Sequence, residues 1–490
     1  MGKLSWLDGA IVLATLLLAV GAGLVLGRKA GSARAWLVGE RDVPWWAILL
    51  SIVATETSSV TFLSVPGVAF TGDLRFLQLP LGYLLGRLVV ARLFLPLYFE
   101  GDALTSYEVL GRRFGPGVKR ASSLLFLVTR SVADGLRLYL TALPLKMLTG
   151  MPLAAAIALM GAVTVAYTFA GGMRAVVWTD VVQFFVYVAG GLLALSVAVG
   201  DVTGGLGGVL QLARDHGKLR LFDFAFALDH ADLFWAGLIG GAFLTLATHG
   251  TDQLMVQRYL CARNAREAGR ALVASGVVVL AQFALFLLLG LALFAWFRDH
   301  PPAAPIRSDD VFPTFISQRL TQLPGAVGLI LGALFAVSMS TLSSSLNSSA
   351  AAAVNDWLKP TVGRSWDDAR TLRVTRGAMV AFALVQVGCG VAGAAFTESV
   401  VKSVLAIASF TTGPTLGLFF LARALRAAPA GSAAARAQGR AALIAFVAAL
   451  AVMTWVWRGT SLAWPWYAVV GSLGTLVLGL VAARLSSARS

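Results

Sequence analysis

The feature that most constrains this chain is a succession of long apolar segments, each of the length that a membrane helix needs. A helix crosses the hydrocarbon core of a bilayer with about 20 mostly apolar residues. Only 13% of the residues are charged and 58% are hydrophobic, whereas a soluble chain has about 25% and about 45–50%. The candidate helices are 8–28, 45–70, 75–99, 120–148, 152–170, 176–199, 232–256, 268–297, 322–355, 372–396, 399–422, 438–457 and 462–484.

These thirteen segments exclude a soluble enzyme, a disordered protein and a secreted disulfide scaffold. They predict an all-α polytopic membrane protein with about 13 transmembrane helices and a single transmembrane domain over 1–490. The net charge of +15 does not predict nucleic-acid binding, because no basic patch lies on a soluble module. If the N-terminus lies outside, about 24 Lys and Arg residues fall in cytoplasmic segments and about 10 in outer ones, which predicts N-outside and C-inside.

Polar residues inside apolar segments carry the functional information, since an ionisable group in mid-membrane is costly and usually faces a site or a partner. The second segment contains Glu56 within a run of hydroxyl residues, followed by Pro66. This run predicts a helix that is broken at mid-membrane and lines a cavity. The alternative is that the hydroxyls bond back to their own helix, which leaves Glu56 unexplained.

A second polar interruption, which includes His249 and Asp252, lies late in the segment 232–256. Paired interruptions in corresponding halves of a chain are typical of transporters built from inverted repeats. His249 alone could equally be a packed histidine. Beside the break at Glu56, it is a candidate for contact with a solute.

A third polar run extends from Ser338 to Ser349. Ser340, Thr341, Ser344 and Ser348 fall near one helical face, and oxygen ligands suit a hard cation. A close helix–helix contact would also be rich in small residues, but the density of hydroxyls here favours a cation site.

Asp180 lies near the start of the segment 176–199. Its carboxylate could complete an oxygen cage, carry a proton, or simply cap the helix. In the fourth segment, Asp134 can pair with both Arg130 and Arg137. If either guanidinium is free, it would select a solute carboxylate.

Taken together, these segments resemble the sodium:solute symporter family over about residues 36–425. The matching motifs are Val38-Gly39-Glu40-Arg41, residues 58–66, residues 104–114, residues 167–180, Thr251-Asp252-Gln253 with Val256-Gln257-Arg258-Tyr259-Leu260, and the run from Ser340 to Asp356. The resemblance implies a leucine-transporter-like fold. Its first inverted five-helix repeat would span 45–199 and its second 232–422, with extra helices at 8–28 and 438–484.

The resemblance also implies sodium sites. The backbone oxygens of the first site would come from Ala54, Thr57 and Val337, and its hydroxyls from Ser340 and Thr341. Some members have a second site of one aspartate and three serines, and the matching residues here are Asp180, Ser340, Ser343 and Ser344. A stoichiometry of two sodium ions is therefore one hypothesis.

The solute cannot be named from the sequence. A carboxylate at position 56 argues against an anionic solute unless an arginine offsets it, and it suits a sugar, a polyol or an amine-bearing solute. The candidate substrate-binding residues are Glu56, Ser58, Thr61, Phe76, Gln78, Arg137, His249 and Phe410.

The sequence therefore predicts a monomeric, multi-pass symporter in the cell inner (plasma) membrane, which imports a small polar organic solute with Na+. One alternative is a proton-coupled carrier that uses Asp180 or Glu56. Another is a transporter-like membrane sensor. An enzyme is not expected, because no nucleophile–base pair or metal-ligand set is recognisable.

Overall fold

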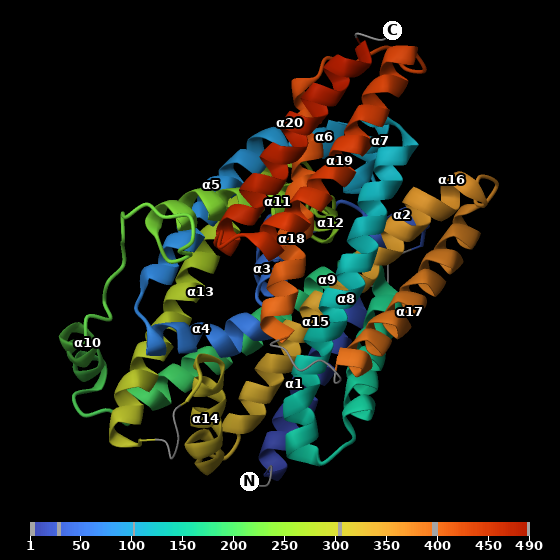
Figure 1. Ribbon diagram of the computed structural model, residues 1–490. Helices are drawn as coiled ribbons and strands as arrows, with labels where there is room; N and C mark the ends of the chain where they lie inside the picture. Colours follow the sequence, from blue (N-terminus) through green and yellow to red (C-terminus); the bar gives the residue numbers. More distant parts are fainter. Residues whose placement is uncertain (1–4, 27–30, 101–102, 302–305, 394–399, 488–490) are drawn as a thin grey trace.

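The computed structural model describes residues 5–26, 31–100, 103–301, 306–393 and 400–487 (Figure 1). Three predicted segments extend beyond these ranges: 8–28, 372–396 and 399–422 include residues 27–28, 394–396 and 399. Each of the thirteen segments is mainly helical where it is described, with breaks inside 45–70 and 232–256. The α-helices of the first half are α1 (Trp6–Leu26), α2 (Ala33–Val38), α3 (Trp45–Glu56), α4 (Ser59–Thr71), α5 (Gln78–Leu93), α6 (Leu95–Glu100), α7 (Ser106–Phe114), α8 (Pro116–Thr149), α9 (Leu153–Gly200) and α10 (Gly205–Asp215).

The second half continues the helical pattern. Its α-helices are α11 (Gly241–Gly250), α12 (Gln253–Tyr259), α13 (Ala265–Asp299), α14 (Val311–Gln318), α15 (Ala326–Ala352), α16 (Lys359–Thr361), α17 (Asp368–Gly393), α18 (Val400–Ala424), α19 (Ala433–Gly459) and α20 (Tyr467–Ser487). Short 3-10 turns cover Arg75–Leu77, Ser308–Asp310, Leu320–Gln322 and Trp464–Trp466, and π-helical turns cover Ala236–Gly240 and Ala353–Leu358.

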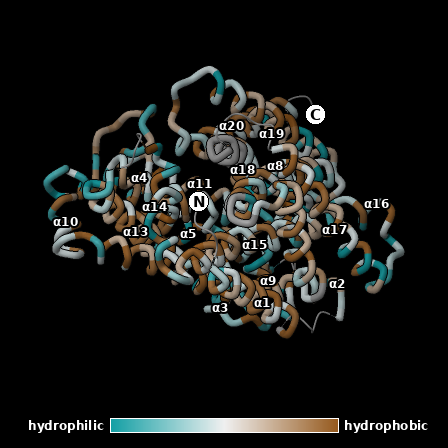
Figure 2. The backbone as a smooth tube through the Cα atoms, turned by 90° about the horizontal axis from the view of Figure 1, so that it is seen from below, coloured by the Kyte–Doolittle hydropathy of each residue, from teal (hydrophilic) through white to brown (hydrophobic). Residues whose placement is uncertain are grey.

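Eight helices of the described part are long and apolar enough to cross a membrane, and the bent pair α3–α4 brings the number to nine. The chain is thus a multi-pass membrane protein, and the count of about 13 crossings stays a prediction. In Figure 2 brown and white helices fill the interior of the bundle, while teal stretches lie near α10 and α16 at its two sides. The helices α10 and α14 lie at the same end as the N-terminus, and the C-terminus lies at the other (Figure 1). This arrangement agrees with the predicted topology, whose orientation stays a prediction.

The centre of the bundle is α15, which packs against α9, α8, α1 and α3. Nearly all of its side chains are buried, including the whole hydroxyl-rich run. The helix α9 carries Asp180 and changes direction at Gly172, where φ is +57° and ψ is −149°. This break separates the two predicted segments 152–170 and 176–199.

Both predicted interruptions are present. The first separates α3 from α4, whose axes differ by 64°. Thr57 leaves the helical conformation, and the hydroxyl of Ser58 caps α4 by accepting from the backbone N–H of Thr61. The second separates α11 from α12 at Thr251, and the carboxylate of Asp252 caps α12. At both interruptions the backbone leaves the helical conformation, so the polar groups there lack the partners that a continuous helix would give them.

Candidate functional site

The end of α3 is held by a buried polar network around Thr57. The Thr57 hydroxyl lies 2.8 Å from the backbone oxygen of Val53 and 3.0 Å from Oε1 of Gln282, and the hydroxyl of Tyr187 donates to the same Gln282 oxygen at 2.9 Å. These contacts tie the break to α9 and α13. They fix the direction of the last carbonyls of α3, which have no partner within a continuous helix.

The predicted first sodium site lies where α15 meets the end of α3. The hydroxyl of Thr341 is 3.3 Å from the backbone oxygen of Thr55 and 3.2 Å from that of Val337. A cavity of about 10 Å³ adjoins this contact. Its lining residues are Ser58, Ser59, Asp134, Arg137, Leu138, Val337, Ser338, Thr341 and Leu342.

This small cavity is about the size that one water molecule needs. The hydroxyl of Ser59 and one carboxylate oxygen of Asp134 are buried there with no hydrogen-bond partner among the described residues. Unsatisfied buried oxygens call for a ligand, and a hard cation prefers oxygen ligands. These oxygens are of the kind that sodium prefers, and backbone oxygens such as that of Val337 would complete the site. Arg137 also lines the cavity and pairs with the other carboxylate oxygen of Asp134.

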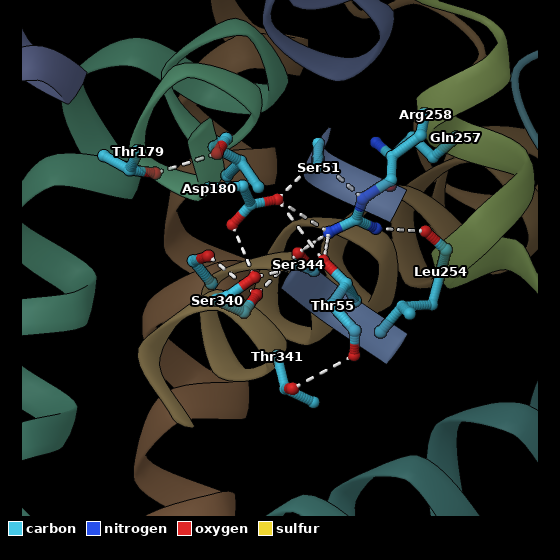
Figure 3. Close-up of polar contacts among 12 residues, drawn as sticks. Ser51, Thr55, Thr179, Asp180, Leu254, Gln257, Arg258, Ser340, Thr341 and Ser344 are labelled. Carbon is cyan, nitrogen blue, oxygen red and sulfur yellow. Dashed lines mark hydrogen bonds and ion pairs between the residues drawn. The ribbon is translucent and has the colours of Figure 1, made fainter. Parts of the chain in front are cut away.

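The predicted second sodium ligands meet around Asp180, together with a side chain that the prediction left out (Figure 3). One carboxylate oxygen of Asp180 accepts from Ser340 at 2.6 Å, and the other accepts from Ser51 at 2.5 Å. The guanidinium of Arg258 reaches the same carboxylate at 3.1 Å. Asp180 and Arg258 are both completely buried. A protein cation therefore already neutralises this carboxylate.

A larger cavity of about 450 Å³ lies between the two broken helices, within the range of small-molecule sites. Five predicted substrate-binding residues line it, together with Arg130 and Asp252, which the sequence marked as polar residues without assigning them to the solute, and Tyr83, which was not predicted. These five are Glu56, Thr61, Phe76, Arg137 and His249. The two interruptions thus form one cavity, as their pairing indicated.

Glu56 does not face this cavity as a free carboxylate. Its side chain forms an ion pair with Arg87 of α5, and Nε2 of His249 lies 3.5 Å from the same oxygen. Arg87 is completely buried, whereas Glu56 is 18% exposed. The arginine that would offset the carboxylate is therefore present, and the argument from Glu56 against an anionic solute loses its basis.

The opposite wall of the cavity carries a chain of four charged groups. Asp134 pairs with Arg137 at 2.6 Å and with Arg130 at 3.7 Å, and Arg130 also pairs with Asp252 of the second interruption at 2.7 Å. The predicted pairing on α8 is therefore confirmed. Arg130 has two carboxylate partners, whereas Arg137 shares one and its Nε has no partner among the described residues. Arg137 is thus the guanidinium better placed to bind a solute.

Three predicted substrate-binding residues lie elsewhere. The amide of Gln78 is held by backbone groups, since its nitrogen donates to the oxygens of Arg75 and Asp232, and its oxygen accepts from the N–H of Asp223. Phe410 packs beside Met453 and Tyr467 in a separate apolar cluster. Ser58 lines the small cavity instead of the large one.

Arg87 and Arg258 are the important residues that were not predicted. Arg87 lies within the apolar segment 75–99, where the cost of an ionisable group should have marked it. Arg258 was quoted within a family motif and counted among the cytoplasmic charges, but it was given no role in the site. The position of each arginine could therefore have been recognised in the sequence. The carboxylate that each arginine contacts could not.

A model of the sodium:solute symporter family matches residues 36–435. The human sodium/iodide cotransporter is 31% identical over 85% of this chain and 65% of its own length. The human sodium-coupled monocarboxylate transporter 2 is 30% identical over 80% of this chain and 64% of its own length. The chain therefore spans about two thirds of the length of these relatives.

A bacterial relative matches over more of its length. The sodium/sialic acid symporter NanT of Aliivibrio fischeri is 28% identical over 94% of this chain and 90% of its own. Among solved structures, the substrate-bound outward-open state of a Na+-coupled sialic acid symporter superposes with a TM-score of 0.87. It is 24% identical, and the match covers 98% of both chains. A nucleobase-cation-symport-1 family transporter gives a TM-score of 0.58 at 15% identity, with 93% of this chain and 95% of the other covered.

Proposed function

Because the chain belongs to the sodium:solute symporter family, whose members are transporters and not enzymes, we propose that it is a sodium-coupled symporter working by alternating access. The observation that carries this proposal is the junction of α15 with the end of α3, where hydroxyl, carbonyl and carboxylate oxygens surround a cavity of about 10 Å³. Sodium bound there would join the broken helix to the central helix. Solute binding and ion binding would thereby depend on the same segment.

We infer that Ala54 and Thr57 supply backbone oxygens to this sodium, with Val337, Ser340 and Thr341. Both Ala54 and Thr57 are buried at the end of α3, a helix that packs against α15. Ser340 reaches this region from a position close to Asp180 and Thr55. The inverted repeats 45–199 and 232–422 are proposed on the same basis, since a broken helix occurs in each.

The solute we propose is a small polar organic molecule with a carboxylate, such as an acidic sugar or a short hydroxy acid. Arg137 lines the cavity with an unpaired Nε, and guanidinium groups bind carboxylates in a bidentate geometry. The names of two relatives include a sialic acid and monocarboxylates. The prediction of a neutral sugar or polyol rested on an unopposed Glu56, and the ion pair with Arg87 removes that reason.

The rest of the proposal follows the sequence. The protein would lie in the cell inner (plasma) membrane with its N-terminus outside, and it would work as a monomer. Proton coupling through Glu56 is the second candidate, because this carboxylate is partly open to the cavity. Its carboxylate is held in an ion pair with Arg87, which a proton carrier would have to break in each cycle.

Uptake into proteoliposomes tests the proposal. Radiolabelled lactate, N-acetylneuraminate, glucose and mannitol would be supplied under an inward sodium gradient, a choline control, or an inward proton gradient. We expect uptake of a carboxylate solute with sodium and not with choline. Uptake driven by the proton gradient without sodium would contradict the proposed coupling. Uptake of only the neutral solutes would contradict the proposed solute class.

A further inference from the structure

The guanidinium of Arg258 lies among the residues that were predicted to hold a second sodium ion. We propose that it takes the place of this second ion, so that the chain couples one sodium ion to each solute. This inference rests on the proposed function, because it concerns the stoichiometry of the same transport cycle. It replaces the hypothesis of two sodium ions that the sequence suggested.

The first argument is that the guanidinium is fully engaged. Its Nε lies 2.9 Å from the hydroxyl of Ser51, and its Nη1 lies 2.6 Å from the backbone oxygen of Leu254. Its Nη2 donates to the hydroxyl of Ser344, the hydroxyl of Thr55 and the carboxylate of Asp180 (Figure 3). Bonds in five directions fix the group in one position, which is typical of a buried arginine that serves as a permanent counter-charge.

The second argument concerns the oxygens that a sodium ion would need. The hydroxyls of Ser343 and Ser344 donate to the backbone oxygen of Ser340 at 3.1 and 2.7 Å. The hydroxyl of Ser340 donates to Asp180 at 2.6 Å. Arg258 donates to two of the four predicted ligands, the Asp180 carboxylate and the Ser344 hydroxyl. A guanidinium N–H and a sodium ion use the same oxygen lone pairs, so an ion would have to displace Arg258 from these two ligands.

The third argument is charge. The side chains of Asp180 and Arg258 are both 0% exposed, and together they are neutral. A sodium ion bound to the same carboxylate would lie against the Arg258 guanidinium, and two like charges in contact disfavour each other in a buried site.

The fourth argument is that this cation is attached to a broken helix. Arg258 belongs to α12, the second part of the interrupted helix that borders the large cavity. Its partners belong to α3, α9 and α15, so one side chain joins four elements of the site. A sodium ion would have to enter from solution, whereas this cation is always present at the site.

Equilibrium binding of radiolabelled sodium to the purified full-length protein tests the proposal. The unmodified protein is expected to bind one sodium ion, with a Hill coefficient of about one. Arg258→Gln removes the resident cation and is expected to bind two ions. The added change Asp180→Asn, in the double variant, is expected to return the number to one. Arg258→Lys keeps the charge and is expected to stay at one.

A buried carboxylate without its partner can prevent folding, so a second measurement keeps the proposal falsifiable. Ser343→Ala in the otherwise unmodified protein removes one of the hydroxyls predicted to bind a second sodium, together with its bond to the backbone oxygen of Ser340, and leaves Asp180 and Arg258 in place. We expect one bound sodium with and without this change. Two ions in the unmodified protein, with one lost in Ser343→Ala, would overturn the proposal. A folded Arg258→Gln that binds a single ion would also overturn it, whereas no sodium binding in the unmodified protein would contradict the proposed function itself.

Discussion

The hydroxyl of Thr341 lies 3.3 Å from the backbone oxygen of Thr55 and thereby connects the central helix α15 to the last turn of the broken helix α3. The same hydroxyl lies 3.2 Å from the backbone oxygen of Val337. Thr341 and Val337 also line the small cavity that we assign to sodium. An ion held there would draw the two helices together, and its loss would free the end of α3 to move.

Thr57→Val should weaken both the fold and sodium binding. The variant loses the hydrogen bond from the Thr57 hydroxyl to the amide oxygen of Gln282. This buried oxygen then keeps only the bond from the Tyr187 hydroxyl within the network. A loss of about 1 kcal/mol in stability is expected, the usual value of one hydrogen bond. Thermal unfolding with and without sodium measures it. Thr454→Val is the control, because that hydroxyl bonds only to its own helix at Leu450, and equal effects of the two changes would contradict this role.

Glu56→Gln should destabilise the protein because it leaves Arg87 charged and buried without its carboxylate. Removing one partner of a buried pair costs about 3–5 kcal/mol. The loss should be smaller here, because the Glu56 side chain is partly exposed to the cavity. The double variant Glu56→Gln with Arg87→Met should recover much of it. A double-mutant cycle of thermal unfolding gives the coupling between the two residues. Additive effects would show that the pair contributes nothing to stability.

Arg137→Gln should abolish the response to carboxylate solutes. The guanidinium is 22% exposed and its Nε is unpaired among the described residues. Arg137→Lys should retain weaker binding, since an ammonium cannot bind a carboxylate in the bidentate way. The thermal shift produced by lactate and by N-acetylneuraminate measures the effect. The exposed Arg373→Gln is the matched control, and a normal response in Arg137→Gln would contradict the assignment.

Gly172→Ala should destabilise the break in α9. The glycine adopts φ +57° and ψ −149°, a conformation that costs other residues about 1–3 kcal/mol. A methyl group there would also lie 2.2 Å from the backbone oxygen of Trp36. Gly388→Ala in α17 is the control, because nothing lies within 4 Å of the position that its added methyl group would take, and alanine is favoured over glycine in helices by about 0.5–1 kcal/mol. Comparable thermal stability of the two variants would contradict this account of the kink.

The helices and their interruptions were predictable from the sequence because lipid imposes strong rules on composition. Apolar length defined the helical segments, and polar residues within them marked the breaks at Glu56 and at Asp252. The hydroxyl-rich run on α15 was correctly placed beside the end of α3. The number of membrane crossings was harder to predict, because several helices are short or interrupted. Within the described residues, eight or nine helices are long and apolar enough to cross a membrane.

The partners of the charged groups were not predictable in the same way. Arg87 lies 31 residues from Glu56 and Arg258 lies 78 residues from Asp180. Helical spacing connects residues only three or four apart, as it did for Asp134 and its arginines. These long-range pairs change the conclusions about solute charge and sodium stoichiometry. At 100 mV, each sodium ion contributes about 2.3 kcal/mol to accumulation, so a single coupled ion provides half the voltage-driven force of two.

Binding of radiolabelled sodium to Thr341→Ala, compared with the unmodified protein and with Ser348→Ala, tests the central claim most directly. Ser348 lies on the same buried helix, but its hydroxyl bonds only within that helix, to the backbone oxygen of Ser345. We predict saturable binding to the unmodified protein that choline does not displace. Thr341→Ala should weaken it about tenfold or more, which corresponds to about 1.4 kcal/mol, while Ser348→Ala should leave it unchanged. The absence of saturable sodium binding, or equal affinities in Thr341→Ala and the unmodified protein, would contradict the account.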